Sequence, residues 1–195
     1  MFMKPSSQHT DCDLIRLFKN GDLNSLELLV HRHKEKIYTS IFLLVRDRHL
    51  AEDIFQNTFI KVIETIRGGS YNEEGKFLPW VSRIAHNLCV DHFRKVKRSP
   101  VFKNSDSTSV TEEVLDSEDG IDQKMMKRQS HEKVRRMIDL LPEDQREVIV
   151  LRHYAGLSFK EVAALTNCSI NTALGRMRYA LLNLRKIMEE RQVAL

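Results

Sequence analysis

Residues 158–180 have the sequence SFKEVAALTNCSINTALGRMRYA, and they decide the fold of the C-terminal part of the chain. Ser158 and Ser169 each precede a helical pattern, where a hydroxyl can accept a hydrogen bond from the backbone of a helix N-terminus. Asn167 lies in the turn between the two helices, and asparagine tolerates the left-handed conformation that such turns need. Ala163 supplies a small side chain where the helices must cross closely. The stretch therefore predicts a helix-turn-helix.

The second helix of this motif has two different faces. Its core face, at about 100° per residue, is expected to hold Ala173, Met177, Ala180, Leu181 and Leu184. Arginine and asparagine can read base edges, leucine can touch a thymine methyl group, and tyrosine can hold a phosphate. The candidates for DNA contact are Asn171, Thr172, Leu174, Gly175, Arg176, Arg178 and, at the margin, Tyr179. The alternative is an ordinary helical hairpin with a solvated basic face.

The rest of the chain is also expected to be helical. Gly (7) and Pro (4) are scarce among the 195 residues, and 42% hydrophobic residues are enough for a packed core. The stretch from residue 104 to 119 has six acidic residues and no basic one, so it cannot bury enough apolar surface to fold alone. We predict an all-α protein with two small helical domains, residues 11–98 and 130–190, joined by a flexible acidic linker at 99–129.

The most informative helix of the N-terminal half covers residues 77–98, with the sequence FLPWVSRIAHNLCVDHFRKVKR. One face has Val81, Ile84, Ala85, Leu88 and His92. The other has Arg83, Asn87, Asp91, Arg94 and Arg98, and Trp80 lies nearer to this basic face. A basic stripe headed by Phe77 and Trp80 suits single-stranded nucleic acid, because rings stack on unpaired bases while cations hold the backbone. The alternative is that both aromatic residues belong to the core and that the charges form a solvated face.

Three motifs in this chain resemble one family. The order Phe77-x-x-Trp80, Ile84-Ala85-x-Asn87 and Asp91-x-x-Arg94 resembles the promoter-melting and −10-reading helix of extracytoplasmic-function (ECF) sigma factors, the two-domain branch of the sigma-70 family. Upstream, AEDIFQNTF at residues 51–59 resembles the polymerase-binding helix of that family. Downstream, Leu141-Pro-x-x-x-Arg146-x-Val-x-x-Leu151 and the helix-turn-helix resemble its −35-binding domain. The resemblance covers about residues 13–186, except the linker.

The resemblance implies a subunit that binds core RNA polymerase and directs promoter-specific initiation, with an anti-sigma factor as a further partner. The implied polymerase contacts are Asp53, Gln56, Asn57 and Phe59. The implied −10 contacts are Phe77, Trp80, Arg83, Asn87, Arg94 and Arg98, with Trp80 by the start of the melted strand and Asn87 near a flipped-out base. The loop at residues 70–76 would shape the pocket for that base, and the helix-turn-helix candidates would meet the −35 element.

Three positions depart from the usual pattern of the family. Asn57 stands where glutamate is usual, which alters the charge of the polymerase contact. Leu174 replaces a common lysine or arginine, and Tyr179 replaces a common arginine. The last two changes remove positive charge from the DNA-facing helix and bear on its −35 sequence preference.

Other kinds of chemistry have no sequence signal here. Cys12, Cys89 and Cys168 are widely spaced, which argues against a disulfide framework or a zinc knuckle. The eight histidines form no metal-binding motif, and neither a phosphate-binding loop nor a nucleophile elbow occurs. We therefore expect no metal, no cofactor and no catalytic residue. The N-terminus lacks a signal-peptide pattern and the apolar runs are too short for a bilayer, so we expect a cytoplasmic protein without membrane insertion.

Two other classes of protein remain to be distinguished from a sigma factor. One is an autonomous dimeric helix-turn-helix repressor or activator, which needs no polymerase-binding or strand-trapping surface. The other is a nucleic-acid-modifying enzyme, which needs a catalytic constellation. Run-off transcription with purified core polymerase would discriminate among the three.

Overall fold

The computed structural model describes residues 9–72, 75–98 and 132–191. In these ranges every regular element is a helix, which confirms the all-α prediction. The chain divides into two compact units, each of which has its own core. The predicted acidic linker at 99–129 lies outside the described residues, so its boundaries stay a prediction. None of the described helices is both long and apolar enough to cross a membrane.

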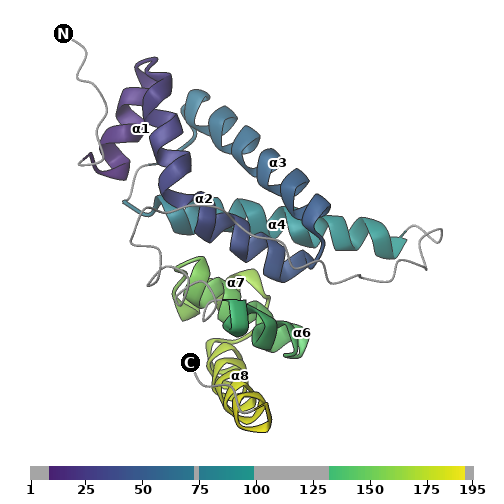
Figure 1. The fold of residues 1–195 in the computed structure, drawn as a ribbon. Helices are drawn as coiled ribbons and strands as arrows, with labels where there is room; N and C mark the ends of the chain where they lie inside the picture. Colours follow the sequence, from purple (N-terminus) through teal and green to yellow (C-terminus); the bar gives the residue numbers. More distant parts are fainter. Residues whose placement is uncertain (1–8, 73–74, 99–131, 192–195) are drawn as a thin grey trace, which may run out of the picture. The chain divides into compact units, whose positions relative to one another are not determined.

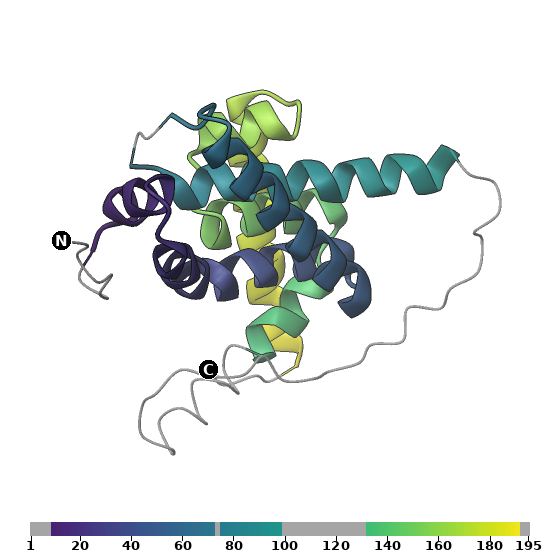
Figure 2. The same cartoon turned by 90° about the horizontal axis from the view of Figure 1, so that it is seen from above.

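The first unit is a bundle of four helices, which Figure 1 shows in purple to teal. Its elements are α1 (Asp11–Lys19), α2 (Leu23–Val45), α3 (Arg48–Arg67) and α4 (Phe77–Arg98). The helix α1 packs on α2, and α2, α3 and α4 pack on one another. In both views the last turns of α4 extend past the ends of α2 and α3 (Figures 1 and 2), so that these turns carry mainly exposed side chains.

Local hydrogen bonds explain where the helices of the first unit begin. The Thr10 hydroxyl accepts from the Asp13 backbone N–H at 3.2 Å, and the Asp13 carboxylate accepts from the Thr10 N–H at 3.2 Å. This reciprocal capping box satisfies two N–H groups that the first turn of α1 leaves open. The side chains of Asp22 and Asp47 cap α2 and α3 in the same position. The helix α4 covers Phe77–Arg98, the range that the sequence predicted.

The core of the first unit draws on all four helices. Its fully or almost fully buried side chains are Leu14, Ile15, Phe18, Leu29, Ile37, Ile41, Val45, Ala51, Ile54, Phe59, Val62, Ile66, Tyr71, Phe77, Val81, Ala85 and Cys89. Two of the expected core residues of α4, Ile84 and Leu88, are only partly buried against this cluster. Cys89 also lies in the core, as expected for a small apolar residue, and burial raises the pKa of its thiol to about 12. Cys89 is thus an inert packing residue.

The second unit contains the predicted helix-turn-helix. A helix at residues 132–139 is followed by α6 (Glu143–Ile149), η1 (Val150–Tyr154), α7 (Phe159–Leu165) and α8 (Ile170–Glu190). The helix α6 continues directly into η1, which is a π-helix. Gly156 ends it with a φ of +71°. The small core of this unit consists of Val148, Leu151, Ala155, Leu157, Val162, Ala163 and Ala173.

The predicted capping and turn residues of the motif have the expected geometry. The Ser158 hydroxyl accepts from the Glu161 N–H, and the Glu161 carboxylate accepts from the Ser158 N–H at 2.8 Å. Asn167 has a φ of +51°, which is the left-handed conformation expected in the turn. The Ser169 hydroxyl accepts from the Thr172 N–H at 3.0 Å and so caps α8. The two helix caps and the turn conformation of Asn167 confirm the helix-turn-helix.

Candidate functional site

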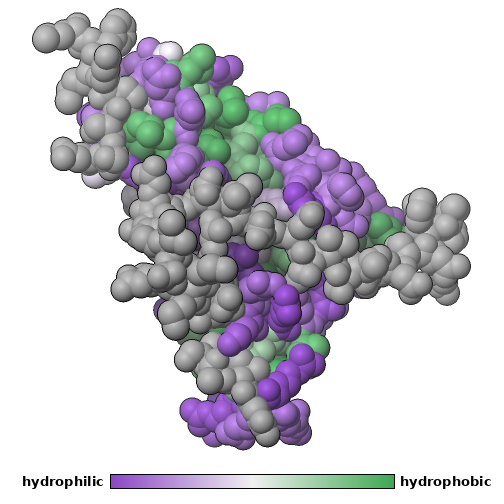
Figure 3. All heavy atoms as spheres, viewed as in Figure 1, coloured by the Kyte–Doolittle hydropathy of each residue, from purple (hydrophilic) through white to green (hydrophobic). Residues whose placement is uncertain are grey.

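The polymerase-contact candidates on α3 fall into two groups. Asp53, Gln56 and Asn57 are exposed on adjoining turns, and Ile60, which is 52% exposed, extends their face. On the side seen in Figure 3, hydrophilic residues gather over the end of α3 that follows α2, and apolar residues gather nearer its other end. Phe59 is only 8% exposed and its ring lies 4.9 Å from that of Phe55. Phe59 therefore packs in the core and does not offer a contact surface, contrary to the expectation.

The polar candidates on α4 lie along one side of the helix. At about 100° per residue, Asn87 and Arg98 fall within about 20° of the direction of Trp80. Asn87, Arg94 and Arg98 are exposed, whereas Arg83 and Trp80 are half-buried. The Arg94 guanidinium lies 3.8 Å from the Asp91 carboxylate, but both side chains are more than half exposed. Such an exposed pair contributes little free energy, so Arg94 can exchange it for another anion at low cost.

The two aromatic residues at the head of α4 differ in their surroundings. Phe77 is 1% exposed and belongs to the core, so the expected stacking of its ring on a base is wrong for this structure. Its position follows from the helix direction, since Phe77 lies on the same buried side as Val81. Trp80 packs against the core from its edge and keeps part of its surface open. Of the two rings, only Trp80 presents surface to a ligand.

A further aromatic residue supports Trp80. The ring centroids of Tyr71 and Trp80 are 4.2 Å apart, and those of Phe77 and Trp80 are 5.9 Å apart. Tyr71 is 6% exposed although it stands in a polar stretch that the sequence predicted to be a loop. Sequence reasoning missed this residue, whose one signal is a large ring among small polar neighbours. The indole of Trp80 thus packs against two buried rings.

The DNA-contact candidates on α8 are mostly exposed. Asn171, Thr172, Leu174, Arg178 and Tyr179 are exposed, and Gly175 and Arg176 are partly so. The exposed fraction reaches 62% for Tyr179 and 44% for Leu174. Of the predicted core face, Ala173 and Ala180 are buried, whereas Leu181 is 57% exposed, so its assignment to the core was wrong. The small core of this unit covers only one narrow side of α8.

Two polar contacts hold α8 against α6. The Nε of Arg176 lies 3.3 Å from a carboxylate oxygen of Asp144, and the side chain of Arg176 is 28% exposed. The Asn183 side-chain N–H donates to the Gln145 carbonyl oxygen at 2.8 Å. Arg176 therefore orients the helix within the protein, while Arg178, two residues later, is exposed.

An open groove of about 360 Å³ runs beside this surface. Its lining consists of Phe159, Leu174, Met177, Arg178, Leu181, Leu182 and Arg185. Five of these side chains are apolar, and the other two carry guanidinium groups. Among the described residues, no group of three or more His, Cys, Asp or Glu side chains is arranged to hold a metal ion.

Comparison with protein families matches both units. Residues 29–99 match the model of sigma-70 region 2, and residues 131–182 match the model of sigma-70 region 4. The chain belongs to the sigma-70 family. Together the two models span more than half of the chain, in the order that the three sequence motifs predicted. As a sigma factor, the protein directs promoter-specific transcription initiation by RNA polymerase. A repressor would have no region 2, so that alternative is excluded.

The relatives place this sigma factor in the ECF branch. The chain is 28% identical over 177 residues to RNA polymerase sigma-H factor of Pseudomonas aeruginosa, covering 88% of this chain and 90% of the relative. It is 29% identical over 178 residues to the ECF RNA polymerase sigma-E factor of Escherichia coli K12, covering 88% and 91%. These relatives are sigma factors, which regulate transcription rather than catalyse a reaction.

Two solved structures share the fold. One is CnrH in complex with the cytosolic domain of CnrY, with a TM-score of 0.60, 21% identity and coverage of 93% of this chain and 99% of that one. The other is the sigma factor RpoE of Bartonella quintana in complex with the anti-sigma factor NepR, with a TM-score of 0.61, 20% identity and coverage of 86% and 98%.

Proposed function

We propose that the exposed side of α4, headed by Trp80, captures the unpaired strand of the −10 element. The observation that carries this proposal is the position of Trp80: its ring is braced by Tyr71 and Phe77, and its open surface lies in line with Asn87 and Arg98. The chain itself carries out no chemical step. It acts in the cytoplasm, where it joins the polymerase, and the polymerase makes the RNA.

The geometry of α4 suits an unpaired strand better than a duplex. A base can stack on a ring only after the two strands have separated, and this stacking stabilises a complex by about 1–3 kcal/mol per base. Asn87, two helical turns after Trp80, can hydrogen-bond with an exposed base edge. The exposed cations Arg94 and Arg98 can then hold the backbone beyond that base. Trp80 and Asn87 should therefore add little to the stability of the closed promoter complex and much to the stability of the open complex.

The exposed face of α8 is proposed to read the −35 element as a duplex. Arg178 and Asn171 can reach base edges, Leu174 can contact a thymine methyl group, and Tyr179 can hold a phosphate. Thr172 has its backbone N–H and its hydroxyl engaged with Ser169, so its methyl group is the part that it offers to DNA. On α3, Asp53, Gln56 and Asn57 are proposed to contact the polymerase; Phe59 and Phe77 are omitted because both are buried.

An anti-sigma factor is proposed as a further partner. The solved neighbour from Bartonella quintana was captured with an anti-sigma factor, and the groove on α8 supplies a surface for one. Leu174, Leu181 and Leu182 form an apolar strip with Arg178 beside it, which fits an amphipathic acidic segment. Because Leu174 and Arg178 also belong to the proposed DNA face, occupation of the groove would block −35 binding.

The strand-capture proposal is tested by permanganate footprinting of unpaired thymines with polymerase assembled on a promoter. Trp80→Ala should reduce the footprint on duplex DNA by roughly 5-fold to 150-fold, the effect of losing one stacking partner. Asn87→Ala should also reduce it, because a hydrogen bond to an exposed base edge is lost. A pre-melted template should partly rescue Trp80→Ala, which starts separation, but not Asn87→Ala, which reads a base.

The matched control is Val96→Ala, because Val96 is 40% exposed and lies about 160° around α4 from Trp80. Its footprint should equal that of the wild type. Wild-type footprints on duplex DNA for both Trp80→Ala and Asn87→Ala would refute the strand-capture role.

A further inference from the structure

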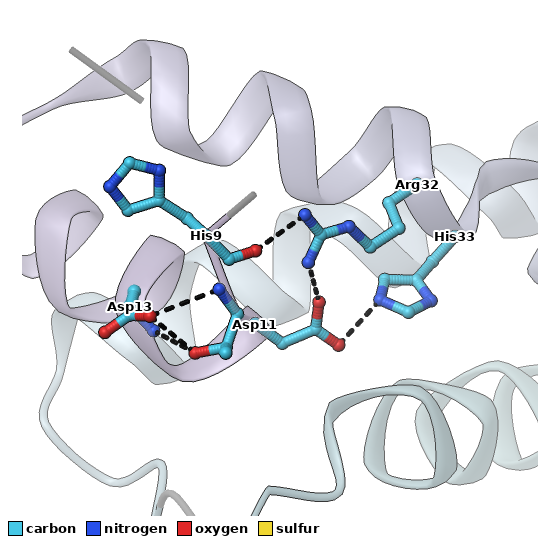
Figure 4. A network of polar contacts seen from close by, with 6 residues as sticks. His9, Asp11, Asp13, Arg32 and His33 are labelled. Atoms are coloured by element: carbon cyan, nitrogen blue, oxygen red, sulfur yellow. Dashed lines mark hydrogen bonds and ion pairs between the residues drawn. The ribbon is translucent and has the colours of Figure 1, made fainter. Parts of the chain in front are cut away.

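A polar network joins the start of α1 to the middle of α2 (Figure 4). One carboxylate oxygen of Asp11 accepts a hydrogen bond from the Arg32 guanidinium at 2.6 Å. The other lies 2.8 Å from Nε2 of His33. A second guanidinium nitrogen of Arg32 donates to the backbone carbonyl of His9 at 2.8 Å. The first residue of α1 is therefore held in place by two side chains of α2.

The His33 ring is the inner end of this network. Burial lowers the pKa of His33, and this effect outweighs the Asp11 carboxylate, which raises it; Arg32 and Lys36 lower it further. Because the Asp11 carboxylate can only accept, Nε2–H of His33 is the donor of this hydrogen bond. The ring centroid of His33 lies 5.4 Å from that of Phe77, the first residue of α4.

A series of ring contacts connects His33 with Trp80 and, through Tyr71, with Lys19 of α1. Phe77 contacts Trp80 at 5.9 Å, Trp80 contacts Tyr71 at 4.2 Å, and the Lys19 ammonium lies 5.9 Å from the centre of the Tyr71 ring. Asp11 begins α1 and Lys19 ends it. The helix thus contacts the aromatic chain at both ends. Because Phe77 and Tyr71 are 1% and 6% exposed, they cannot shift without disturbing the rings next to them.

We propose that α1 positions Trp80 for strand separation, through Asp11 and His33 at one end and Lys19 at the other. This inference rests on the proposed strand-capture function. It assigns a role to a helix that lies before the region-2 match, which begins at residue 29. Asp11, His33 and Lys19 are positioning residues, because they act on DNA only by holding Phe77, Tyr71 and finally Trp80.

The first test measures the surroundings of Trp80 without DNA. Trp80 is the only tryptophan among the 195 residues, so its fluorescence reports on this site alone. Asp11→Ala and Lys19→Met should each make Trp80 more accessible to acrylamide quenching. Asp11→Asn should restore only part of the shielding, because it keeps one oxygen to accept from His33 but loses the oxygen that accepts from Arg32. Arg16→Ala is the control, because it removes only the exposed ion pair of Arg16 with Asp13 and leaves the contacts of Asp11 with Arg32 and His33 in place.

The second test measures open-complex formation by the same full-length variants with core polymerase. Asp11→Ala should reduce open complexes by roughly 2-fold to 30-fold, the range of indirect coupling between residues. The double variant Asp11→Ala with Trp80→Ala should be no worse than Trp80→Ala alone, because both changes act through one ring.

The outcomes separate this inference from the function on which it rests. Unchanged acrylamide quenching in Asp11→Ala and Lys19→Met would overturn the inference. It would also be overturned if the fold-losses of open complex in the two single variants multiplied in the double variant, because α1 would then act through protein stability. Normal melting by Asp11→Ala beside a defective Trp80→Ala would overturn the positioning role alone. Normal melting by Trp80→Ala itself would overturn the strand-capture function, even if quenching confirmed the physical link.

Discussion

The two arginines of α8 that flank Met177 should have different roles, and this difference can be measured. Arg178 is exposed, whereas Arg176 lies 3.3 Å from Asp144 with 28% of its side chain exposed. We predict that Arg178→Ala weakens binding to the −35 duplex and leaves stability unchanged. Arg176→Ala should change DNA binding less, and it should lower the free energy of unfolding by less than about 1 kcal/mol, since the pair is only partly buried.

The size of the Arg178 effect depends on which group it contacts. If the guanidinium is bidentate to a guanine, its loss costs about 1–3 kcal/mol of discrimination, or roughly 5-fold to 150-fold in affinity ratio. If it holds a phosphate, affinity falls equally for all sequences, and the slope of log K against log salt becomes shallower by about 0.9.

The assay is holoenzyme binding to a −35 duplex and to single-base-pair substitutions of it, each over a series of salt concentrations. Thermal unfolding of the same proteins supplies the stability values. Unchanged affinity, discrimination and salt slope for Arg178→Ala would refute its placement on the DNA. A larger loss for Arg176→Ala than for Arg178→Ala would show that the roles of the two arginines are reversed.

Three further predictions concern the first unit. Asp53→Arg with Gln56→Ala should weaken polymerase binding by a few kcal/mol, because the positive charge that pairs with Asp53 on the polymerase would lose its partner. Co-purification with core polymerase at wild-type yield would contradict this. Phe77→Ala should lower the free energy of unfolding by about 3–5 kcal/mol, since the ring is 1% exposed, and a thermal melt like that of the wild type would exclude a core role. Burial holds the pKa of His33 below 6.5 in the folded protein. As the pH falls, the His33 imidazole is therefore protonated in the unfolded chain before it is protonated in the folded protein. The free energy of unfolding consequently decreases as the pH falls from about 6.5 to the folded-state pKa. Urea unfolding at pH 7.5 and 5.5 should therefore show a smaller loss for His33→Gln than for the wild type, and equal losses would mean that His33 is not desolvated.

The helices and the helix-turn-helix could be predicted from the sequence because their signals are local. The Ser158 hydroxyl accepts from a backbone N–H only three residues away, and the left-handed conformation at Asn167 depends on that residue itself. The apolar spacing along each helix also needs no knowledge of its neighbours. The fold class, the motif and the exposure of Asp53, Asn87 and Arg178 all follow from such short-range patterns.

The sequence did not determine which residues of each face are covered, because burial depends on what lies opposite. Phe59 and Phe77 were expected at interfaces and lie in the core, whereas Leu181 was expected in the core and is exposed. Periodicity places a residue on a side of its helix, but the width of the covered side is decided by the packing of neighbouring helices. On α8 the second core is too narrow to reach Leu181.

Only the tertiary structure revealed the support of Trp80. Asp11 and His33 are 22 positions apart, and the rings of His33, Phe77 and Tyr71 come from α2, α4 and the segment that precedes α4. No local pattern relates these residues, since each meets the next only after the helices have packed. The sequence by itself determined that an aromatic residue heads a basic helix. Tertiary packing decided that Trp80 contacts the buried rings of Phe77 and Tyr71 and still keeps part of its surface open.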